Sequence, residues 1–307
     1  MEIFLLGPTG AGKSRAAIEV AEQTGAEIVS MDAFQVYRGL DIGTGKPTKA
    51  EQNRVRHHMI DLVNPEENFT AADYARRGGE ILHEVGKRSI ATIWVGGTGL
   101  YHRVMTEGLS MAPGTEIGVA EELEKKTMAE LVEEISRVDP EWSAKADIKN
   151  RRRVVRALAV WRQTGRKLSE WQEKEMVAGP MGGVEAWALL PDLQILGEVI
   201  RERVKTMWQA GWVEEVRGLA EKAGWEGSPG SRAIGYGEVS EFLAGRLTEA
   251  EACDEIVTAT RAYAKRQLTW FRKIPKIRGI EIDPREPLSK AGVQMLSQSL
   301  LGRGSAA

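Results

Sequence analysis

The chain has 307 residues, of which 42% are hydrophobic and 28% charged, and its formal net charge is −2 at pH 7. This composition is ordinary for a soluble globular protein of one or two domains. The single cysteine, Cys253, excludes an internal disulfide and a cysteine-rich zinc module. The apolar runs fall short of the ~20 residues of a membrane span, and a strand pattern directly after Met1-Glu2 leaves no room for a signal peptide. We therefore expect a cytoplasmic protein with no membrane partner, and we take it to be a monomer.

An apolar run at residues 3–6 leads into Gly7-Pro8-Thr9-Gly10-Ala11-Gly12-Lys13-Ser14, which fits the P-loop pattern G-x-x-x-x-G-K-[ST] without a gap. Residues 14–23 then have the period of an amphipathic helix, so the motif lies in the strand–loop–helix context that it requires. Backbone N–H groups and the helix N-terminus would hold an anion, with Lys13 on the outer phosphates and Ser14 on Mg²⁺. The alternative is a chance glycine-rich turn, but the sequence favours a di- or triphosphate site with Mg²⁺ as cofactor.

The next segments continue the alternation of strands and helices. Residues 27–31 have the pattern of a strand that ends at Asp32, and a glycine-rich loop without helical period follows at 33–47. Residues 57–61 are expected to form a short strand, in which His57 and His58 face opposite sides and so form no metal pair. A helix at 70–87 precedes an apolar strand at 90–95, which runs into Gly96-Gly97-Thr98-Gly99.

Strands that alternate with helices predict an α/β fold, a P-loop NTPase-like parallel sheet with flanking helices. Ligands of such sheets lie at the carboxyl ends of the strands. The P-loop, Asp32 and Thr98 all follow strands, so we expect them to converge on one crevice.

The second half of the chain is predicted to be mostly helical. Helices are expected at 121–138, 150–164, 196–222, 236–243 and 248–273, with strands at 184–190 and 277–282 and a hinge at 179–183. We therefore predict a catalytic core at 1–110 and 184–283, a helical insertion at 111–183, and a flexible tail at 284–307.

Two stretches are strongly basic despite the small net charge. Residues 148–168 contain eight Lys or Arg and no acid, and residues 261–278 contain seven and again no acid. Tyr263, Trp270 and Phe271 are interleaved with the second stretch, in the way that stacking surfaces for unpaired bases would be. Core packing is the more ordinary interpretation for Trp270 and Phe271, and a solvated helix face is the ordinary interpretation for the arginines.

A kinase or nucleotide hydrolase would place an aspartate for Mg²⁺ at the end of a neighbouring apolar strand. Here the best apolar strand, at 90–95, ends in glycine, and no Asn-Lys-x-Asp guanine signature is present. A different phosphate substrate becomes attractive, and Asp32 is free to act as a base.

The ordered set of motifs resembles the tRNA dimethylallyltransferases, from Met1 to about Arg278. The motifs are, in chain order, Gly7 to Ser14, Asp32-Ala33-Phe34-Gln35-Val36-Tyr37-Arg38-Gly39-Leu40-Asp41-Ile42-Gly43-Thr44-Gly45-Lys46-Pro47, His57-His58-Met59-Ile60-Asp61, Val95-Gly96-Gly97-Thr98-Gly99-Leu100-Tyr101, Arg156-Ala157-Leu158, Ala233-Ile234-Gly235-Tyr236 and Ala264-Lys265-Arg266-Gln267-Leu268-Thr269-Trp270-Phe271. The resemblance implies transfer of a dimethylallyl group from dimethylallyl pyrophosphate to N6 of adenosine 37 in the anticodon stem-loop of tRNA.

The resemblance also implies roles for individual residues. Asp32 would be the general base, and Thr98 would contact the reacting centre, although turn and helix caps are the ordinary use of such residues. The pyrophosphate ligands would be Thr9, Gly10, Ala11, Gly12, Lys13, Ser14 and Arg203. The tRNA ligands would be Asp32, Ala33, Phe34, Gln35, Thr98, Arg152, Arg153, Arg156, Lys265 and Arg266. Phe34 could equally be a core residue.

The match departs from the family at three positions. Ala120 and Val199 stand where arginines are usual, and Asn150 stands where an aspartate is usual. Arg203, one turn after Val199 on the same helix face, is expected to compensate in part. We expect a functional but weaker clamp on pyrophosphate or RNA.

Three other functions stay open at this point. A small-molecule or nucleoside kinase uses the same P-loop, but the Mg²⁺ aspartate is missing. An isopentenyltransferase of free adenine nucleotides would not need two basic stretches or the insertion. A non-catalytic RNA-binding module would have no use for a complete P-loop facing Asp32 and Thr98.

Overall fold

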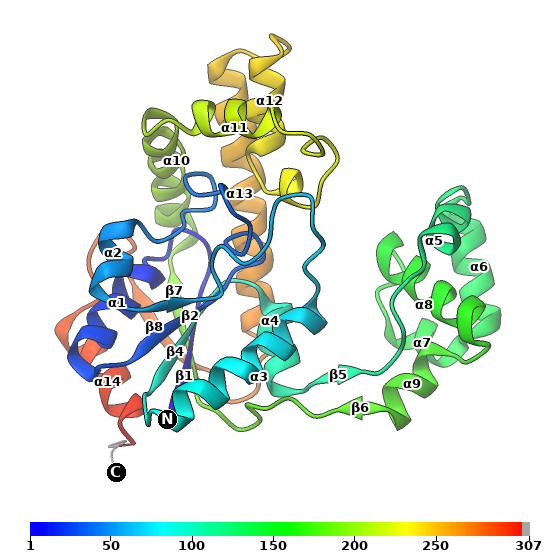
Figure 1. Ribbon diagram of the computed structural model, residues 1–307, viewed down its shortest axis with the longest axis horizontal. Helices are drawn as coiled ribbons and strands as arrows, with labels where there is room; N and C mark the ends of the chain where they lie inside the picture. The colour runs from blue at the N-terminus through cyan, green and yellow to red at the C-terminus, as the bar shows by residue number, and fades with distance from the viewer. Residues whose placement is uncertain (303–307) are drawn as a thin grey trace. The chain divides into compact units, whose positions relative to one another are not determined.

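Six parallel strands form the central sheet, in the order β3-β2-β4-β1-β7-β8 (Figure 1). The bounds are β1 Glu2–Leu6, β2 Glu27–Met31, β3 His57–His58, β4 Thr92–Gly96, β7 Ala186–Pro191 and β8 Arg278–Ile282. The structure is a computed structural model that describes residues 1–302, with Ile117 described by its backbone alone. The predicted P-loop NTPase-like parallel sheet is confirmed.

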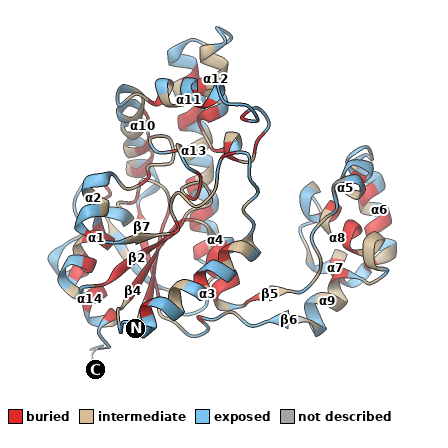
Figure 2. Cartoon of the chain, in the orientation of Figure 1, coloured by how far each residue is buried: buried red, intermediate tan, exposed pale blue. Residues whose placement is uncertain are grey.

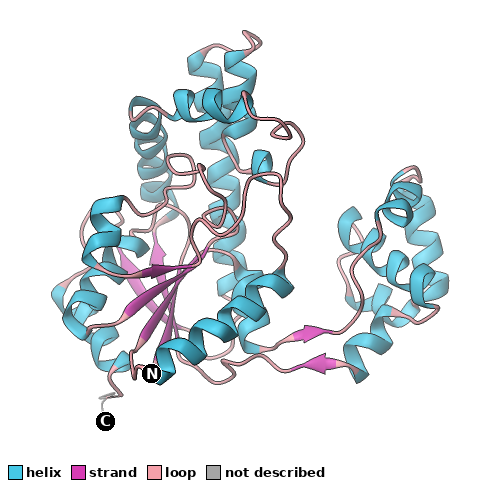
Figure 3. Cartoon of the chain, in the orientation of Figure 1, coloured by secondary structure: helices cyan, strands magenta, loops and turns pink. Residues whose placement is uncertain are grey.

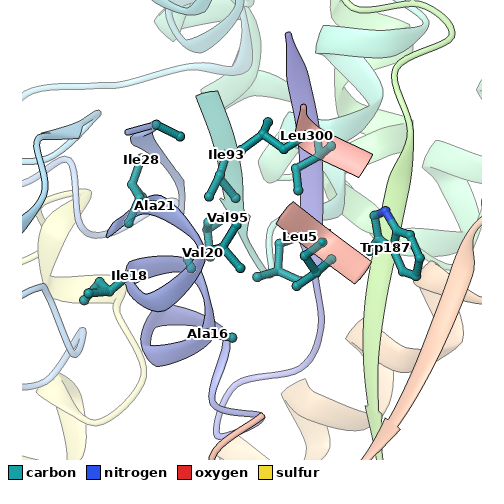
Figure 4. Close-up of a cluster of buried hydrophobic side chains, with 14 of the residues drawn as sticks. Leu5, Ala16, Ile18, Val20, Ala21, Ile28, Ile93, Val95, Trp187 and Leu300 are labelled. Atoms are coloured by element: carbon teal, nitrogen blue, oxygen red, sulfur yellow. The ribbon is translucent and has the colours of Figure 1, made fainter. Parts of the chain in front are cut away.

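Alternation of side chains along the strands gives the sheet two apolar faces, and its central strands are buried (Figure 2). Leu5 and Ile93 point to the face that is covered by α1 (Lys13–Thr24) and α14 (Lys290–Leu300), as Figure 4 shows. Phe4 and Trp94 point to the opposite face, where His102 packs against Phe4 and Tyr74 packs against Trp94. Tyr101 stacks on Tyr74. The sheet is therefore covered on both faces, which explains why its strands are apolar without alternation.

Figure 3 shows the remaining helices of residues 1–103 and 183–302. They are α2 Lys49–Arg54, α3 Ala71–Lys87, α4 Gly99–Thr106, α10 Leu193–Gln209, α11 Trp212–Ala220, the 3₁₀ turn η1 Gly230–Arg232, α12 Tyr236–Leu243 and α13 Glu249–Phe271. Thr70 and Thr248 each accept a hydrogen bond from the third residue of the helix that they begin, in complete capping boxes. The predicted starts of these two helices are confirmed.

Two expectations about the core are wrong in detail. The single helix predicted at 196–222 is divided, because Gly211 has φ 100° between α10 and α11, a left-handed conformation that glycine adopts readily. The strand predicted at 57–61 ends at His58, because Met59 already has φ 62°. The Nε2 atom of His58 forms a hydrogen bond with Glu27 Oε2 at 2.6 Å, and this contact anchors the edge of the sheet.

The flexible tail predicted at 284–307 is also wrong for residues 290–300. Residues 290–300 form α14, whose Val293, Leu296 and Leu300 are buried in the same cluster as residues of α1 and the sheet. Their spacing of three, four and seven residues is that of one helix face. Residues 303–307 lie outside the described part of the chain.

The chain divides into two compact units. One consists of Met1–Arg103 with Gly183–Ala307, which we call the core unit, and the other is Val104–Gly182, which we call the insertion unit. The insertion unit thus begins within α4, earlier than the predicted 111. None of the helices described over residues 1–302 is long and apolar enough to span a membrane.

The insertion unit is a helical bundle on a short antiparallel ribbon. Its elements are β5 Leu109–Ser110, α5 Ile117–Glu124, α6 Met128–Val138, α7 Pro140–Lys145, α8 Arg151–Thr164, α9 Leu168–Lys174 and β6 Met176–Val177. The helix predicted at 121–138 is interrupted, because Thr127 caps a new helix at α6. Asn150 accepts a hydrogen bond from the Arg153 amide and caps α8, which an aspartate would do equally well.

Candidate active site

The P-loop lies between β1 and α1, at the carboxyl end of the central strand. Gly10 and Gly12 have φ 83° and 77°, values that favour glycine. A side chain at Gly10 would also press on Leu196 and Ile200 of α10, at 3.2 and 3.4 Å. The loop is therefore held between the sheet and α10.

Four backbone amides of the loop are available to an anion. Within residues 1–302, the N–H groups of Gly10, Gly12, Lys13 and Ser14 have no protein acceptor. The predicted ligands Thr9 and Ala11 differ, because their amides donate to Gln267 Oε1 at 2.9 Å and to Pro8 O at 3.2 Å. Thr9 can contribute only its hydroxyl.

Lys13 is arranged as an anion ligand. Its Nζ donates to Pro8 O at 2.8 Å, which holds the ammonium group over the loop. Burial lowers the pKa of Lys13 to about 8, with Asp32 acting against that shift and Arg203 adding to it. A bound pyrophosphate would supply the negative charge that keeps this lysine protonated.

Asp32 follows β2, and its geometry suits both a turn cap and a general base. Its Oδ1 accepts from the amides of Phe34 at 2.8 Å and Gln35 at 3.3 Å, which closes a turn. Its Oδ2 has no hydrogen-bond partner among the residues that the structure describes. Burial raises the pKa of Asp32 above its usual value, and the two amides together with Lys13 and Arg203 limit that rise. Asp32 is thus a turn cap with one oxygen left for chemistry.

Thr98 follows β4, and its backbone N–H donates to Met31 O at 3.2 Å, the residue before Asp32. Its hydroxyl is buried and finds no hydrogen-bond partner within residues 1–302. A helix cap would accept from an amide of α4, so that interpretation of Thr98 is wrong.

Two adjoining cavities of the core unit open beside these groups. A polar cavity of about 490 Å³ is lined by the P-loop, Asp32 and Arg203, and an apolar cavity of about 270 Å³ lies next to it. The residues that line both are Thr9, Asp32, Thr44, Arg203, Met207 and Tyr263. The apolar walls are supplied by Phe34, Ile200, Val204, Trp212, Ala233, Ile234 and Ile256. The predicted convergence is confirmed for the P-loop and Asp32, whereas Thr98, which was expected to join them, is not among the residues that line either cavity.

The loop at 33–47 is held by side chains on both sides. Gln35 accepts from Ser30 Oγ at 2.8 Å and donates to Gly45 O at 3.1 Å, so its carboxamide is engaged within the protein. The buried Lys46 Nζ donates to Asp41 and Asp61 at 2.5 and 2.6 Å. Such a loop presents a fixed wall to both cavities.

The sequence did not identify Tyr263 and Gln267 as residues of the site. Tyr263, which is predicted as a stacking surface for RNA, lines both cavities. Burial and the nearby Asp32 raise its pKa to about 12, so its phenol stays protonated. Gln267 is one helical turn further along α13 and is buried. Their spacing of four residues was a signal for a shared helix face.

The predicted RNA ligands on basic helices fall into two groups. Arg152, Arg153, Lys265 and Arg266 are exposed, and none has an ion-pair partner within residues 1–302. Arg156 is different, because it donates to Ala112 O at 3.1 Å and to Thr115 Oγ1 at 3.3 Å inside the insertion unit. Its guanidinium supports the fold of that unit.

Known proteins are similar to this chain over most of its length. The family described as IPP transferase matches residues 35–274. The chain belongs to the IPP transferase family. A tRNA dimethylallyltransferase of Geobacter sulfurreducens is 42% identical over 286 residues, covering 91% of each chain. One of Myxococcus xanthus is 39% identical over 275 residues, covering 88% of this chain and 89% of that one.

Solved structures of IPP transferases agree with this assignment. The tRNA isopentenylpyrophosphate transferase of Bacillus halodurans has a TM-score of 0.71 at 29% identity, covering 98% of this chain and 96% of that one. A eukaryotic dimethylallyltransferase acting on tRNA has a TM-score of 0.84 at 22% identity, covering 99% and 80%. The second likeness shows a shared fold.

Proposed function

We propose that this chain transfers a dimethylallyl group from dimethylallyl pyrophosphate to N6 of adenosine 37 in tRNA. The observation that carries the proposal is the free oxygen of Asp32, in a cavity that it shares with the P-loop and Arg203. A base beside an anion site is what prenyl transfer to an amine needs. The match of residues 35–274 to the IPP transferase family argues against the kinase alternative.

The donor would bind across the two cavities. Its pyrophosphate would accept hydrogen bonds from the amides of Gly10, Gly12, Lys13 and Ser14 and from the side chains of Lys13 and Arg203. Its dimethylallyl group is apolar and would be covered by the apolar wall that begins at Phe34 and Ile200. The reacting carbon would then lie where the two cavities meet, beside Asp32.

The reaction replaces a carbon–oxygen bond by a carbon–nitrogen bond and moves one proton. The N6 atom of adenine attacks the allylic carbon, the carbon–oxygen bond to pyrophosphate breaks, and the N6 proton passes to Asp32 Oδ2. Adenine's exocyclic amine is a weak nucleophile, so proton acceptance in the transition state contributes about 10²–10⁴-fold. The raised pKa of Asp32 makes it a stronger base than an exposed carboxylate. The Thr98 hydroxyl would form a hydrogen bond with the adenine or with the departing pyrophosphate.

Mg²⁺ fits the donor set at the start of α1. Ser14 lines the polar cavity and is exposed, and its hydroxyl oxygen is a ligand that Mg²⁺ accepts together with phosphate oxygens. Mg²⁺ would neutralise charge on the departing pyrophosphate. Ser14 would hold it, and Lys13 would stabilise the same charge from the other side.

Binding of tRNA would use exposed basic residues and the turn after β2. Arg152 and Arg153 of α8 and Lys265 and Arg266 of α13 are free to contact phosphates. Adenosine 37 would have to leave the loop stack to reach Asp32, where Ala33 and Phe34 flank the base. With tRNA as substrate, the enzyme would act in the cytoplasm, and we expect it to do so as a monomer.

The test is a transfer assay with unmodified tRNA that carries A37, labelled dimethylallyl pyrophosphate and Mg²⁺. Asp32→Asn is the sharpest variant, because its amide oxygen still accepts from Phe34 while the base is lost. We expect label in tRNA with the wild type and at least ~10²-fold less with Asp32→Asn. Tight tRNA binding without transfer by the wild type would indicate a binding module, and ATP turnover without tRNA binding would indicate a kinase.

A further inference from the structure

We propose that Gln267 is a positioning residue for prenyl transfer, one whose carboxamide fixes the P-loop against the turn at residues 96–98 and, through it, against Asp32. The inference rests on the proposed function. It concerns how the pyrophosphate site is held in a fixed position relative to the carboxylate of Asp32. Gln267 lies on α13, 258 residues from its P-loop partner along the chain.

Both ends of the Gln267 side chain are engaged, and the side chain is only 6% exposed. Its Oε1 accepts from the Thr9 amide at 2.9 Å, and its Nε2 donates to Gly97 O at 3.0 Å. The opposite orientation of the amide would bring two donors together at Thr9 and two acceptors together at Gly97, so only one orientation satisfies both. A side chain at Gly97 would collide with Nε2, which explains the glycine there.

The link continues from Gly97 to the catalytic carboxylate. Next in the chain, Thr98 donates its amide to Met31 O at 3.2 Å, and Met31 precedes Asp32. Gly96 lies too close to the Met31 backbone to carry a side chain. The turn at 96–98 is therefore rigidly seated on the end of β2.

Beyond the last paired residues of β1 and β4, the side chain of Gln267 connects the P-loop with the turn. The pairing of β1 with β4 ends at Leu6 and Gly96, so Thr9 of the P-loop and Gly97 of the turn lie beyond the last paired residues. Gln267 is the bridge between them among residues 1–302. Without it, the P-loop could shift relative to Asp32, and a displacement of about 1 Å can cost ~10²-fold in rate.

The first experiment compares wild type with Gln267→Met, which keeps the length of the side chain and removes both hydrogen bonds. Glu255→Gln is the matched control, on an exposed position of the same helix. We expect Gln267→Met to lower kcat by about 10–100-fold and to weaken pyrophosphate binding severalfold, measured by calorimetry. The KM for tRNA should stay within about twofold, because the basic residues that grip it are unchanged.

The second variant, Gln267→Glu, should have an activity that depends on pH in a way that a general packing role would not produce. The introduced carboxyl, when protonated, can accept from Thr9 and donate to Gly97, as the native amide does. When ionised, it has no proton to donate to Gly97 O. The ratio of its activity to wild type should therefore rise as pH falls from 8 to 5.5, while the ratio for Gln267→Met stays flat.

The outcomes separate this proposal from the function on which it rests. Pyrophosphate affinity is measured without tRNA, so a wild type that binds pyrophosphate and fails to modify tRNA would count against the transfer function alone. The role of Gln267 is overturned if a folded Gln267→Met binds pyrophosphate as the wild type does. A pH-independent ratio for Gln267→Glu, in transfer or in pyrophosphate affinity, would overturn it as well.

Discussion

The hydroxyl of Tyr236 donates a hydrogen bond to Oε1 of Glu215 at 2.6 Å, from one helix of the core unit to another. The same carboxylate accepts from the backbone amides of Asp41 and Ile42 at 2.9 and 2.7 Å and of Gly43 at 3.2 Å. Four donors thus converge on Glu215. The glycine-rich loop that lines both cavities is seated on this one side chain.

Glu215→Gln should loosen the loop, because the new NH₂ group must face at least one of these donors. We expect a loss of about 1–3 kcal/mol in the free energy of unfolding, measured by urea denaturation. The neighbouring Glu214→Gln is the control, since its carboxylate is 68% exposed and pairs only with Arg217 in the described structure. Equal stability of the two variants would contradict the convergence of donors.

Leu296→Ala tests whether α14 belongs to the core. Leu296 is fully buried in the cluster shared by α1 and the sheet, so its truncation should cost about 2–5 kcal/mol. Gln294→Ala, on the exposed side of the same helix, should change stability by no more than about 0.5 kcal/mol. Thermal unfolding of both variants decides the matter. A tail that contributes nothing would leave the two alike.

The limits of sequence-based prediction are visible in these elements. The P-loop, α3 and α13 are predictable because their signals are local, in a glycine pattern or a capping box of four residues. The apolar face of α14 is equally local, but the chain end Gly302-Arg303-Gly304-Ser305-Ala306-Ala307 suggests a flexible tail from Pro284 onward. The break at Gly211 lies inside a continuous helical period, where one glycine is weak evidence.

Contacts between distant segments could not be predicted at all. The P-loop amide of Thr9 meets Gln267 from the far end of the chain, and Glu215 meets the loop after β2. Either contact requires the fold to exist first. By contrast, Asp32 and Lys13 could be placed together, because parallel strands of a P-loop sheet bring their carboxyl ends to one edge.

The pH dependence of kcat/KM for the prenyl donor should have a limb near pH 8. Free enzyme must have Lys13 protonated to attract pyrophosphate, and burial lowers the pKa of Lys13 to about 8. Above that pH the lysine is neutral and kcat/KM falls. At saturating donor the bound anion raises the pKa of Lys13, so the profile of kcat should lose this limb. A flat kcat/KM between pH 7.5 and 9.5 would contradict the role of Lys13.

Val199→Arg should strengthen the clamp on the leaving group. Val199 lines the polar cavity beside Gly10, one turn before Arg203 on α10, and it stands where related sequences are expected to have arginine. A guanidinium there can donate to a phosphate oxygen, and a hydrogen bond to a charged group contributes about 1.5–3 kcal/mol. We expect pyrophosphate to bind about tenfold more tightly or better by calorimetry, and the KM for the prenyl donor to fall.

The control for this gain is Gln209→Arg, which adds the same charge to an exposed position of α10 outside the polar cavity. An equal gain from both variants would mean that net charge alone attracts the anion. No change in either KM or rate with Val199→Arg would show that Arg203 already supplies the contact. A gain confined to Val199→Arg assigns the weakness of the clamp to that single position, because the two variants differ only in where the cation stands.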